Sequence, residues 1–403
     1  MSYRIVRVTS LYDASLKQYY AMFPDYKHRS YGDQYNHLIN ESCDSAALIS
    51  RNMKALGVDA IDIFTNAEWL QNQWRIENSC EKSGKELILE QIKKLSPTVL
   101  WLDDPQLIDS RWISVVRDNI PTLRIVTGEI CAPYDSEDLK NLRMLDFLVT
   151  CTPCLRNEFE SNGIKTYLVY HAFERSILAR LGEQNKYPVN DLLFTGSLYT
   201  GGGFHNSRIQ YLERFLDADI PVKIYGSIES TRKIFSKKTA FYGINLLRKS
   251  GLEKLLDHIP PLKRYEAYGD TPVRFYSRKL KASVLPPVFG IEQFKLLSKA
   301  KICFNIHGEV ARACAGNLRL FEATGVGACL VTDWKENLGE LFEIDKEVVA
   351  YTSEEECAEK IKWLLQNPSE VTRIGQAGKA RTLKDHSTQN RANQINEILT
   401  KLL

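Results

Sequence analysis

The chain has 403 residues, and its 53 Lys and Arg against 50 Asp and Glu give a formal net charge of only +3. Hydrophobic residues make up 44% and charged residues 26%, which is typical of a folded globular protein and excludes a disordered, collagen-like or low-complexity chain. No apolar run approaches the roughly 20 residues that a membrane-spanning helix needs.

The first residues and the cysteines predict a cytoplasmic location. The residues after Met1 are typical of a strand, and they lack the apolar segment and cleavage site of a secretory signal. Nine cysteines are an odd number, and most stand alone in apolar segments, which favours reduced, buried thiols over a disulfide framework. The one close pair, Cys151 and Cys154, could be half of a zinc site or a redox motif, but no second such pair follows. We therefore expect two thiols at a strand-to-helix turn, and no metal or other cofactor.

The chain alternates strands and helices in two series, so about two domains are expected for this length. In the first series a polar, tyrosine-rich stretch (12–40) follows the first strand, and the expected strands are 3–9, 58–64, 98–102, 123–127, 146–150 and 166–170. The strands expected in the second series are 192–195, 222–225, 302–306, 328–332 and 348–351. This alternation predicts an α/β fold with two doubly wound parallel sheets. The expected division is a first domain (1–173), a linker (174–190), a second domain (191–385) and a C-terminal helix (386–403) that packs back on the first domain.

One segment (228–285) interrupts the second series. It holds thirteen Lys and Arg against five Asp and Glu, with tyrosines and phenylalanines between the basic residues. We expect a basic insertion, which is either an ordinary solvent-exposed face or a contact with an anionic membrane surface, glycan or lipid. Nucleic acid is not an expected partner, because the chain lacks a helix-turn-helix, zinc-finger or aromatic strand motif and is nearly neutral overall.

The most informative segment runs from Asn305 to Asp333. It reads as a strand, a loop that contains Gly316, a helix that begins near Asn317, and a second buried strand. Backbone amides at the start of a helix form an anion site, and a glycine lets a phosphate approach closely. Arg319 adds a positive charge in the first turn, and Glu322 lies beside it on the same helix face.

This segment resembles the C-terminal domain of CgeB-like glycosyltransferases. The resemblance is carried by Asn317–Asp333, Leu338–Glu343, Glu354–His386, Tyr170–Phe173 and Phe194–Tyr199, and it covers about 168–398 without the basic insertion. It implies a GT-B architecture, in which two Rossmann-like domains face each other across a cleft and the second domain holds a nucleotide-sugar donor.

The resemblance also implies where the donor binds. Glu322 would bind the ribose, while backbone amides of the loop and helix start, two arginines and the loop after 192–195 would face the diphosphate, so that no metal is required. The expected donor-binding residues are Gly196, Ser197, Arg208, Gly316, Asn317, Leu318, Arg319 and Glu322.

The sequence indicates the catalytic residues less clearly than the donor-binding residues. Related retaining enzymes carry two glutamates eight positions apart, but Cys314 stands eight positions before Glu322. Glu309 is the alternative contact to the donor sugar, beside Cys314 itself. The candidate catalytic residues are Glu129, Asp103 and His307; each has an alternative role, the two acids in turns or caps and the histidine as a structural residue.

We expect a glycosyltransferase that moves a sugar from a nucleoside-diphosphate sugar to a hydroxyl of a glycan, a lipid-linked glycan or another molecule. The alternatives are a catalytically silent nucleotide- or glycan-binding protein of the same fold and a sugar-nucleotide epimerase. The expected location is cytoplasmic, with peripheral membrane contact through 228–285 as one option. The tyrosines of 12–40 form either an acceptor surface or ordinary packing; they are Tyr12, Tyr19, Tyr20, Tyr26, Tyr31 and Tyr35.

Overall fold

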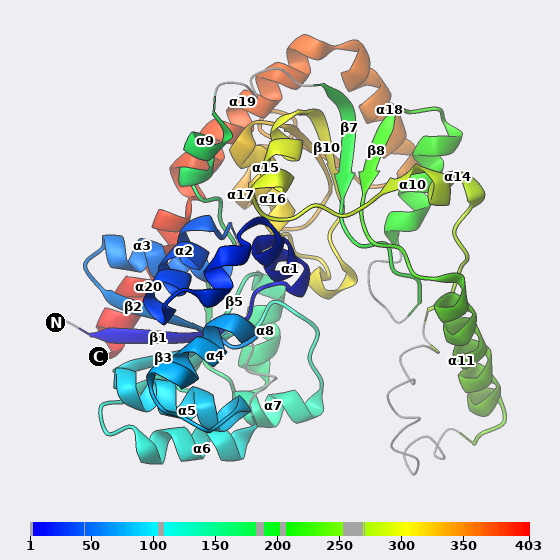
Figure 1. Ribbon diagram of the computed structural model, residues 1–403. Coiled ribbons are helices and arrows are strands. Elements are labelled where there is room, and N and C mark those ends of the chain that lie inside the picture. The colour runs from blue at the N-terminus through cyan, green and yellow to red at the C-terminus, as the bar shows by residue number, and fades with distance from the viewer. Residues whose placement is uncertain are drawn as a thin grey trace.

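A computed structural model describes residues 3–43, 45–103, 109–182, 189–201, 207–252, 269 and 271–403. It contains two parallel sheets of six strands each, flanked by helices, which form two domains (Figure 1). The expected α/β fold with two doubly wound domains is confirmed. None of the helices described is long and apolar enough to cross a membrane.

Both sheets contain only parallel strand pairs. The first has the order β2-β1-β3-β4-β5-β6 and the second the order β12-β11-β10-β7-β8-β9. The strands of the first are β1 (Arg4–Thr9), β2 (Asp59–Phe64), β3 (Val99–Leu102), β4 (Ile125–Glu129), β5 (Phe147–Thr150) and β6 (Thr166–Leu168). The strands of the second are β7 (Asn190–Thr195), β8 (Val222–Tyr225), β9 (Val284–Leu285), β10 (Ala300–Asn305), β11 (Cys329–Asp333) and β12 (Val349–Tyr351).

The helices cover both faces of each sheet. Those of the first domain are α1 (Asp13–Met22), η1 (Pro24–His28), α2 (Tyr31–Glu41), α3 (Ser45–Ala55), α4 (Glu68–Glu77), α5 (Gly84–Leu95), α6 (Ser110–Asn119), α7 (Ser136–Leu142) and α8 (Pro153–Ser161). Those that follow are α9 (Ser176–Leu181), α10 (Ser207–Asp217), α11 (Thr231–Lys249), α14 (Arg278–Ser283), α15 (Gly290–Ser298), η5 (Glu309–Ala311), α16 (Leu318–Val326), α17 (Leu338–Leu341), α18 (Glu354–Gln366), α19 (Pro368–Asp385) and α20 (Thr388–Leu402).

Strand sequences explain why the sheets are buried on both faces. All four residues of β3 and of β5 are buried, so these central strands are continuous apolar runs rather than alternating ones. Helix α8 begins where Thr152 accepts a hydrogen bond from the amide of Leu155 and Pro153 occupies the first turn. Local sequence therefore places the start of α8 directly behind the end of β5, at the edge of the sheet that faces the second domain.

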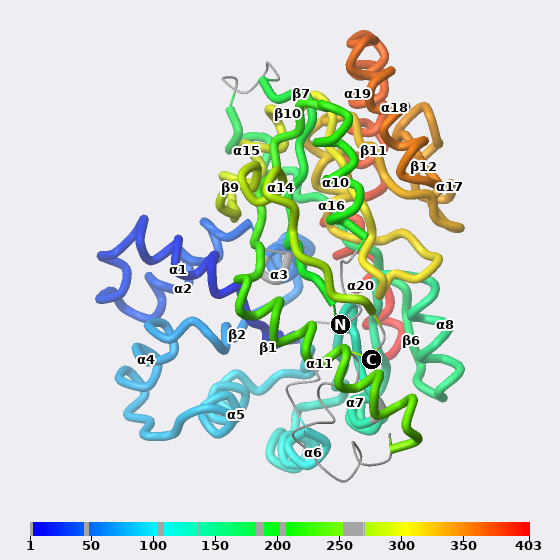
Figure 2. Tube along the Cα trace, turned by 90° about the vertical axis from the view of Figure 1, so that its right-hand side faces the viewer, coloured from blue at the N-terminus to red at the C-terminus, as the bar shows by residue number. Residues whose placement is uncertain are grey.

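The last helix crosses from the second domain to the first. Ala392, Ile395 and Leu399 of α20 pack in one buried cluster with Trp101 of the first sheet, and Figure 2 shows α20 beside that domain. The Tyr3 hydroxyl donates to the side-chain carbonyl of Asn396 at 2.7 Å. The first domain therefore completes its core with the end of the chain.

A group of hydrogen bonds fixes the point where the chain passes from the second domain to the first. Phe173 exchanges backbone hydrogen bonds with His386 and Thr388 (2.9 and 3.0 Å). Arg391 donates from Nε to the carbonyl of Tyr170 at 2.8 Å and from Nη2 to Nδ1 of His386 at 2.9 Å. Because Nδ1 accepts, Nε2 of His386 carries the proton and donates to the carbonyl of Leu341.

Some expected elements differ from the structure. The tyrosine-rich stretch is helical rather than a loop, and Tyr19, Tyr20 and Tyr35 are buried in a local core, whereas Tyr12 is 65% exposed. Helix α9 lies inside the expected linker (174–190), of which 183–188 fall outside the described residues.

Part of the expected basic insertion (228–285) is described, whereas residues 253–268 and 270 lie outside the described residues. Its end forms β9, which pairs in parallel with β8 at the edge of the second sheet. A strand of two residues is too short to show an alternating pattern in the sequence. Its position is set by pairing with the neighbouring strand. Helix α11 extends away from that sheet in Figure 1.

His386 should make the stability of the protein sensitive to acid. Burial and the nearby Arg391 charge lower the pKa of His386 from 6.5 to about 4, although the hydrogen bond to the Leu341 carbonyl opposes that shift. The unfolded chain therefore binds a proton between these values that the folded chain does not, so stability falls as pH falls. At 1.36 kcal/mol per unit, this histidine should cost about 2 kcal/mol between pH 7 and pH 5. Urea unfolding at the two values measures the loss.

The matched variants are His386→Gln and, at an exposed histidine, His28→Gln. The first should lose less stability between pH 7 and pH 5 than the wild type by about that amount, while the second should behave like the wild type. An unchanged pH dependence in His386→Gln would contradict the assignment.

Candidate functional site

A cavity of about 710 Å³ lies between the two domains. Its first-domain wall is formed at the carboxyl ends of β3, β4, β5 and β6, and its second-domain wall at the ends of β7 and β10 and the start of α16. In doubly wound sheets, ligands bind outside the carboxyl ends of the strands where the strand order reverses. In the second sheet that point lies between β7 and β10, which both open into this cavity.

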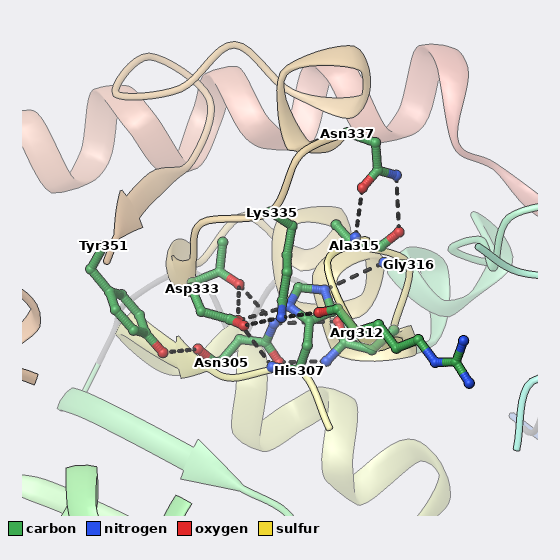
Figure 3. A network of polar contacts seen from close by, with 11 residues as sticks. Asn305, His307, Arg312, Ala315, Gly316, Asp333, Lys335, Asn337 and Tyr351 are labelled. Atoms are coloured by element: carbon green, nitrogen blue, oxygen red, sulfur yellow. Dashed lines mark hydrogen bonds and ion pairs between the residues drawn. The ribbon is translucent and has the colours of Figure 1, made fainter. Parts of the chain in front are cut away.

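The second-domain wall is built on a polar network behind β10 (Figure 3). The side-chain amide of Asn305 donates to the Thr332 hydroxyl at 2.9 Å, and the Tyr351 hydroxyl donates to the Asn305 carbonyl at 2.8 Å. Asn317 donates from Nδ2 to Oδ1 of Asn305 at 2.8 Å. These contacts tie the end of β10 to the first residue before α16, and they were not expected from the sequence.

His307 is part of this network rather than exposed to the cavity. The amide of Gly316 donates to Nε2 of His307 at 3.3 Å, so Nδ1 carries the proton and donates to the Asp333 carboxylate at 2.7 Å. The His307 side chain is fully buried. Burial raises the pKa of Asp333, but His307 and Lys335 outweigh it and lower that pKa overall. His307 is thus a positioning residue with both ring nitrogens engaged, and its expected catalytic role is not supported.

The loop before α16 is held from two further directions. Asn337 accepts from the amide of Ala315 at 2.6 Å, and its Nδ2 donates to the Ala315 carbonyl and to the Tyr170 hydroxyl, each at 3.1 Å. A β-carbon at Gly316 would lie 2.4 Å from the carbonyl oxygen of Cys151 in the first domain. The missing side chain of Gly316 therefore makes room for the other domain and its amide donates to His307, while the expected approach of a phosphate stays a prediction.

Helix α16 presents its first turn to the cavity. Its N-cap residue, Asn317, caps none of the first-turn amides, because its side chain bonds Asn305 instead. Leu318, Arg319 and Glu322 line the same cavity. Glu322 accepts from Arg319 Nη1 at 2.7 Å and from Gln293 Nε2 at 3.3 and 3.4 Å. This expected group of residues is thus brought together, with Gln293 as an addition that the sequence did not reveal.

Two largely buried guanidinium groups, those of Arg208 and Arg319, lie at this helix start. Arg208, in the first turn of α10, donates from Nη1 to the carbonyl of Ser197 at 3.1 Å, beside Gly196. Burial lowers the pKa of Arg208 to about 10, and the neighbouring Arg319 also lowers it. The Nε atoms of Arg208 and Arg319 are buried and have no acceptor among the described residues. Two such cations at the start of a helix form a site for an anion.

A disulfide joins the two domains next to this loop. Cys154, at the start of α8, is bonded to Cys314, two residues before Gly316. Arg312 and Glu158 form an ion pair beside it. The expectation of nine reduced thiols is therefore wrong for this pair, whose 160-residue separation leaves no signal in the sequence. Cys314 is also not a contact to a donor sugar, because its sulfur is bonded and buried.

The first-domain wall carries two of the expected acids. Glu129 is the last residue of β4, and burial raises the pKa of its carboxyl to about 7, although His171 opposes that shift. Asp103 follows β3 and accepts from Arg7 Nη2 at 2.6 Å. Both line the cavity, whereas Glu309 is exposed and does not. Cys131, Cys151 and His171 surround Glu129 on this wall, and their proximity was not expected.

Comparisons with known proteins agree with this geometry. Residues 248–397 match a family model described as glycosyl transferase-like. The structure is similar to a glycosyltransferase from Rickettsia africae (TM-score 0.58, 11% identity, covering 100% of this chain and 98% of that one). It is also similar to sucrose-phosphate synthase from Thermosynechococcus elongatus and to Anabaena HepE in complex with UDP and glucose (each TM-score 0.57, 11% identity, 99% of both chains). The chain has the GT-B fold. No curated protein sequence matches it.

The interdomain disulfide of this GT-B protein predicts a definite thiol count. Alkylation in denaturant without reductant should modify seven cysteines, and alkylation after reduction all nine, as read by intact mass. Peptide mapping should recover the peptides of Cys154 and Cys314 joined only in the unreduced sample. The variant Cys314→Ser should give eight thiols under both conditions, and nine thiols in the unreduced wild type would contradict the pairing.

Proposed function

We propose that this protein is a CgeB-like glycosyltransferase, which moves a sugar from a nucleoside-diphosphate sugar to an acceptor hydroxyl in the cavity between its domains. The observation that carries the proposal is the pair of largely buried guanidinium groups, Arg208 and Arg319, at the uncapped start of α16. A departing diphosphate is the anion that such a site stabilises, and preorganised cations lower the barrier most where charge develops.

The donor would lie along the second-domain wall. Once Gln293 yields its long hydrogen bonds of 3.3 and 3.4 Å, Oε1 of Glu322 is free and Oε2 keeps only the bond from Arg319, so the carboxylate would accept from adjacent ribose hydroxyls. Gly196 and Ser197 would lie beside the diphosphate, since they follow β7 at the same edge of the sheet. The arginines neutralise the leaving group in this arrangement, so the transfer itself needs no metal at the diphosphate.

The acceptor would enter from the first-domain wall. Glu129 is the candidate base, because its carboxyl lines the cavity and is held in a buried place at the end of β4. Asp103 is tied to Arg7 and is better placed to orient a hydroxyl than to take its proton. UDP and glucose are the molecules named in the HepE complex, and UDP-glucose is accordingly the first donor to test.

Nucleotide binding gives the first test. Among UDP, GDP, CDP, ADP and TDP, one should raise the melting temperature of the wild type, since a ligand that binds only the folded state stabilises it by mass action. Glu322→Ala should weaken that binding by at least about tenfold, because hydrogen bonds to a charged group contribute roughly 1.5–3 kcal/mol.

The control is Glu343→Ala at an exposed glutamate of the same domain, which should bind like the wild type. Equal affinity of the wild type and Glu322→Ala for every nucleotide would contradict the proposed donor site. Release of the diphosphate from UDP-glucose, or from another nucleotide sugar, then measures turnover.

A silent nucleotide-binding protein is the second candidate, favoured by one observation. Cys314 stands where retaining relatives carry their first glutamate, and its sulfur is committed to the disulfide. Nucleotide binding without any turnover or transfer across a panel of donors would favour this candidate, whereas release of the diphosphate would exclude it.

We also propose that α11 docks the enzyme on an anionic membrane that carries a lipid-linked acceptor. The helix has six basic residues and no acidic one. Phe235, Tyr242 and Leu246 share one face of it and are 61–68% exposed. By helical spacing Lys238 and Lys249 lie beside that face, so positive charge and exposed apolar side chains are both available to an anionic lipid surface.

Replacing all three apolar residues of α11 with alanine should lower binding to vesicles that contain an anionic lipid, because the apolar face supplies the burial that charge alone does not. Sedimentation with vesicles measures the bound fraction. Trp363→Ala, at an exposed tryptophan on α18, is the control and should bind like the wild type. Equal binding by the triple variant and the wild type would refute the membrane contact.

A further inference from the structure

We infer that Cys131, Cys151 and His171 form a binding site for one zinc ion on the first-domain wall of the cavity. This inference goes beyond the proposed transfer reaction, and it stands on the positions of three side chains that the donor site does not use.

Topology brings the three residues together. Cys131 follows β4 by two residues, Cys151 follows β5 directly, and His171 follows β6 by three residues. These strands are neighbours in a parallel sheet, so their carboxyl ends meet at one edge. The two sulfurs and a ring nitrogen of the histidine all lie within 4.8 Å of one another. In a tetrahedral zinc site with bonds of about 2.0–2.3 Å, such atoms lie about 3.5–3.8 Å apart.

The chemistry of the three groups selects the metal. Thiolate sulfur and imidazole nitrogen favour zinc over magnesium and calcium, which take oxygen ligands. Both cysteines are free thiols in the structure, while Cys154, the other half of the CxxC pair, is bonded to Cys314. Cys151 and Cys154 therefore cannot both bind one metal ion, as the two cysteines of a CxxC pair usually do. Cys131 supplies the second sulfur instead.

The site leaves room for a fourth ligand. Cys131, Cys151 and His171 all line the cavity, and Oε1 of Glu129 lies 3.7 Å from the Cys131 sulfur. Three protein ligands with a fourth position open to a cavity are the pattern of zinc sites that bind water or a substrate group, whereas structural sites are closed by four protein ligands. The ion would lie across the cavity from Arg208 and Arg319, so it would not replace them at the diphosphate.

Metal binding can be measured without any assay of sugar transfer. The full chain is purified without a histidine tag and dialysed against metal-free buffer, and elemental analysis should find about one zinc per chain. The metal-depleted protein is then titrated with Co²⁺, which takes the same ligands. Two thiolate ligands should give a sulfur-to-cobalt charge-transfer band in the near ultraviolet that saturates at one equivalent.

Single variants identify the ligands. Cys131→Ser, Cys151→Ser and His171→Ala should each weaken Co²⁺ binding by at least about tenfold and reduce the band, while Cys80→Ser, at a free cysteine elsewhere in the first domain, should keep it. Circular dichroism confirms that each protein is folded.

The inference fails if the folded wild type, with its seven thiols reduced, carries no zinc and gives no charge-transfer band. It fails equally if all three ligand variants retain the band. Either result would leave the proposed donor site intact, because nucleotide binding is read separately by thermal shift.

Discussion

The position of one loop governs the rest of the site. Three contacts hold the segment between β10 and α16. The amide of Gly316 donates to His307, the amide of Ala315 donates to Asn337, and a disulfide joins Cys314 to the first domain. Because the amides of Ala315 and Gly316 and the carbonyl of Ala315 already have partners, the end of the loop has little freedom, and this fixes the start of α16. The first turn is left uncapped because the Asn317 side chain bonds Asn305 in the same network.

Electrostatics divide the cavity into two halves. On the second-domain wall, Arg208 and Arg319 are largely buried and their Nε atoms lie away from water, so an anion beside them would gain more than it would at the surface. On the first-domain wall, the same burial raises the pKa of Glu129 and favours its neutral form. The second-domain wall thus suits a negatively charged ligand group, and the first-domain wall suits a ligand group that gives up or takes a proton.

The sequence predicted the two parallel sheets, apart from β9, and the grouping of Arg319 with Glu322, because both depend on local patterns. Glu322 and Arg319 are three residues apart on one helix, and Gly196 follows a clear strand, so their positions follow from spacing. The partners of Gly316 are different. Cys151 is 165 positions away, Cys154 and Cys314 are 160 apart, and no pattern within either segment records how the two domains dock. Strand ends of different βα units also meet only in the folded sheet, which is why Cys131, Cys151 and His171 were read as unrelated residues.

Helix α20 has a consequence for how the protein is made. The face of the first sheet that contains Trp101 is covered by Ala392, Ile395 and Leu399, which the ribosome adds only after it has made the second domain. At roughly 5–20 residues per second, the first domain would wait tens of seconds with that apolar face uncovered. The first domain of the nascent chain therefore exposes that apolar face until α20 is made, and loss of α20 would leave the first domain, rather than the second, prone to aggregate.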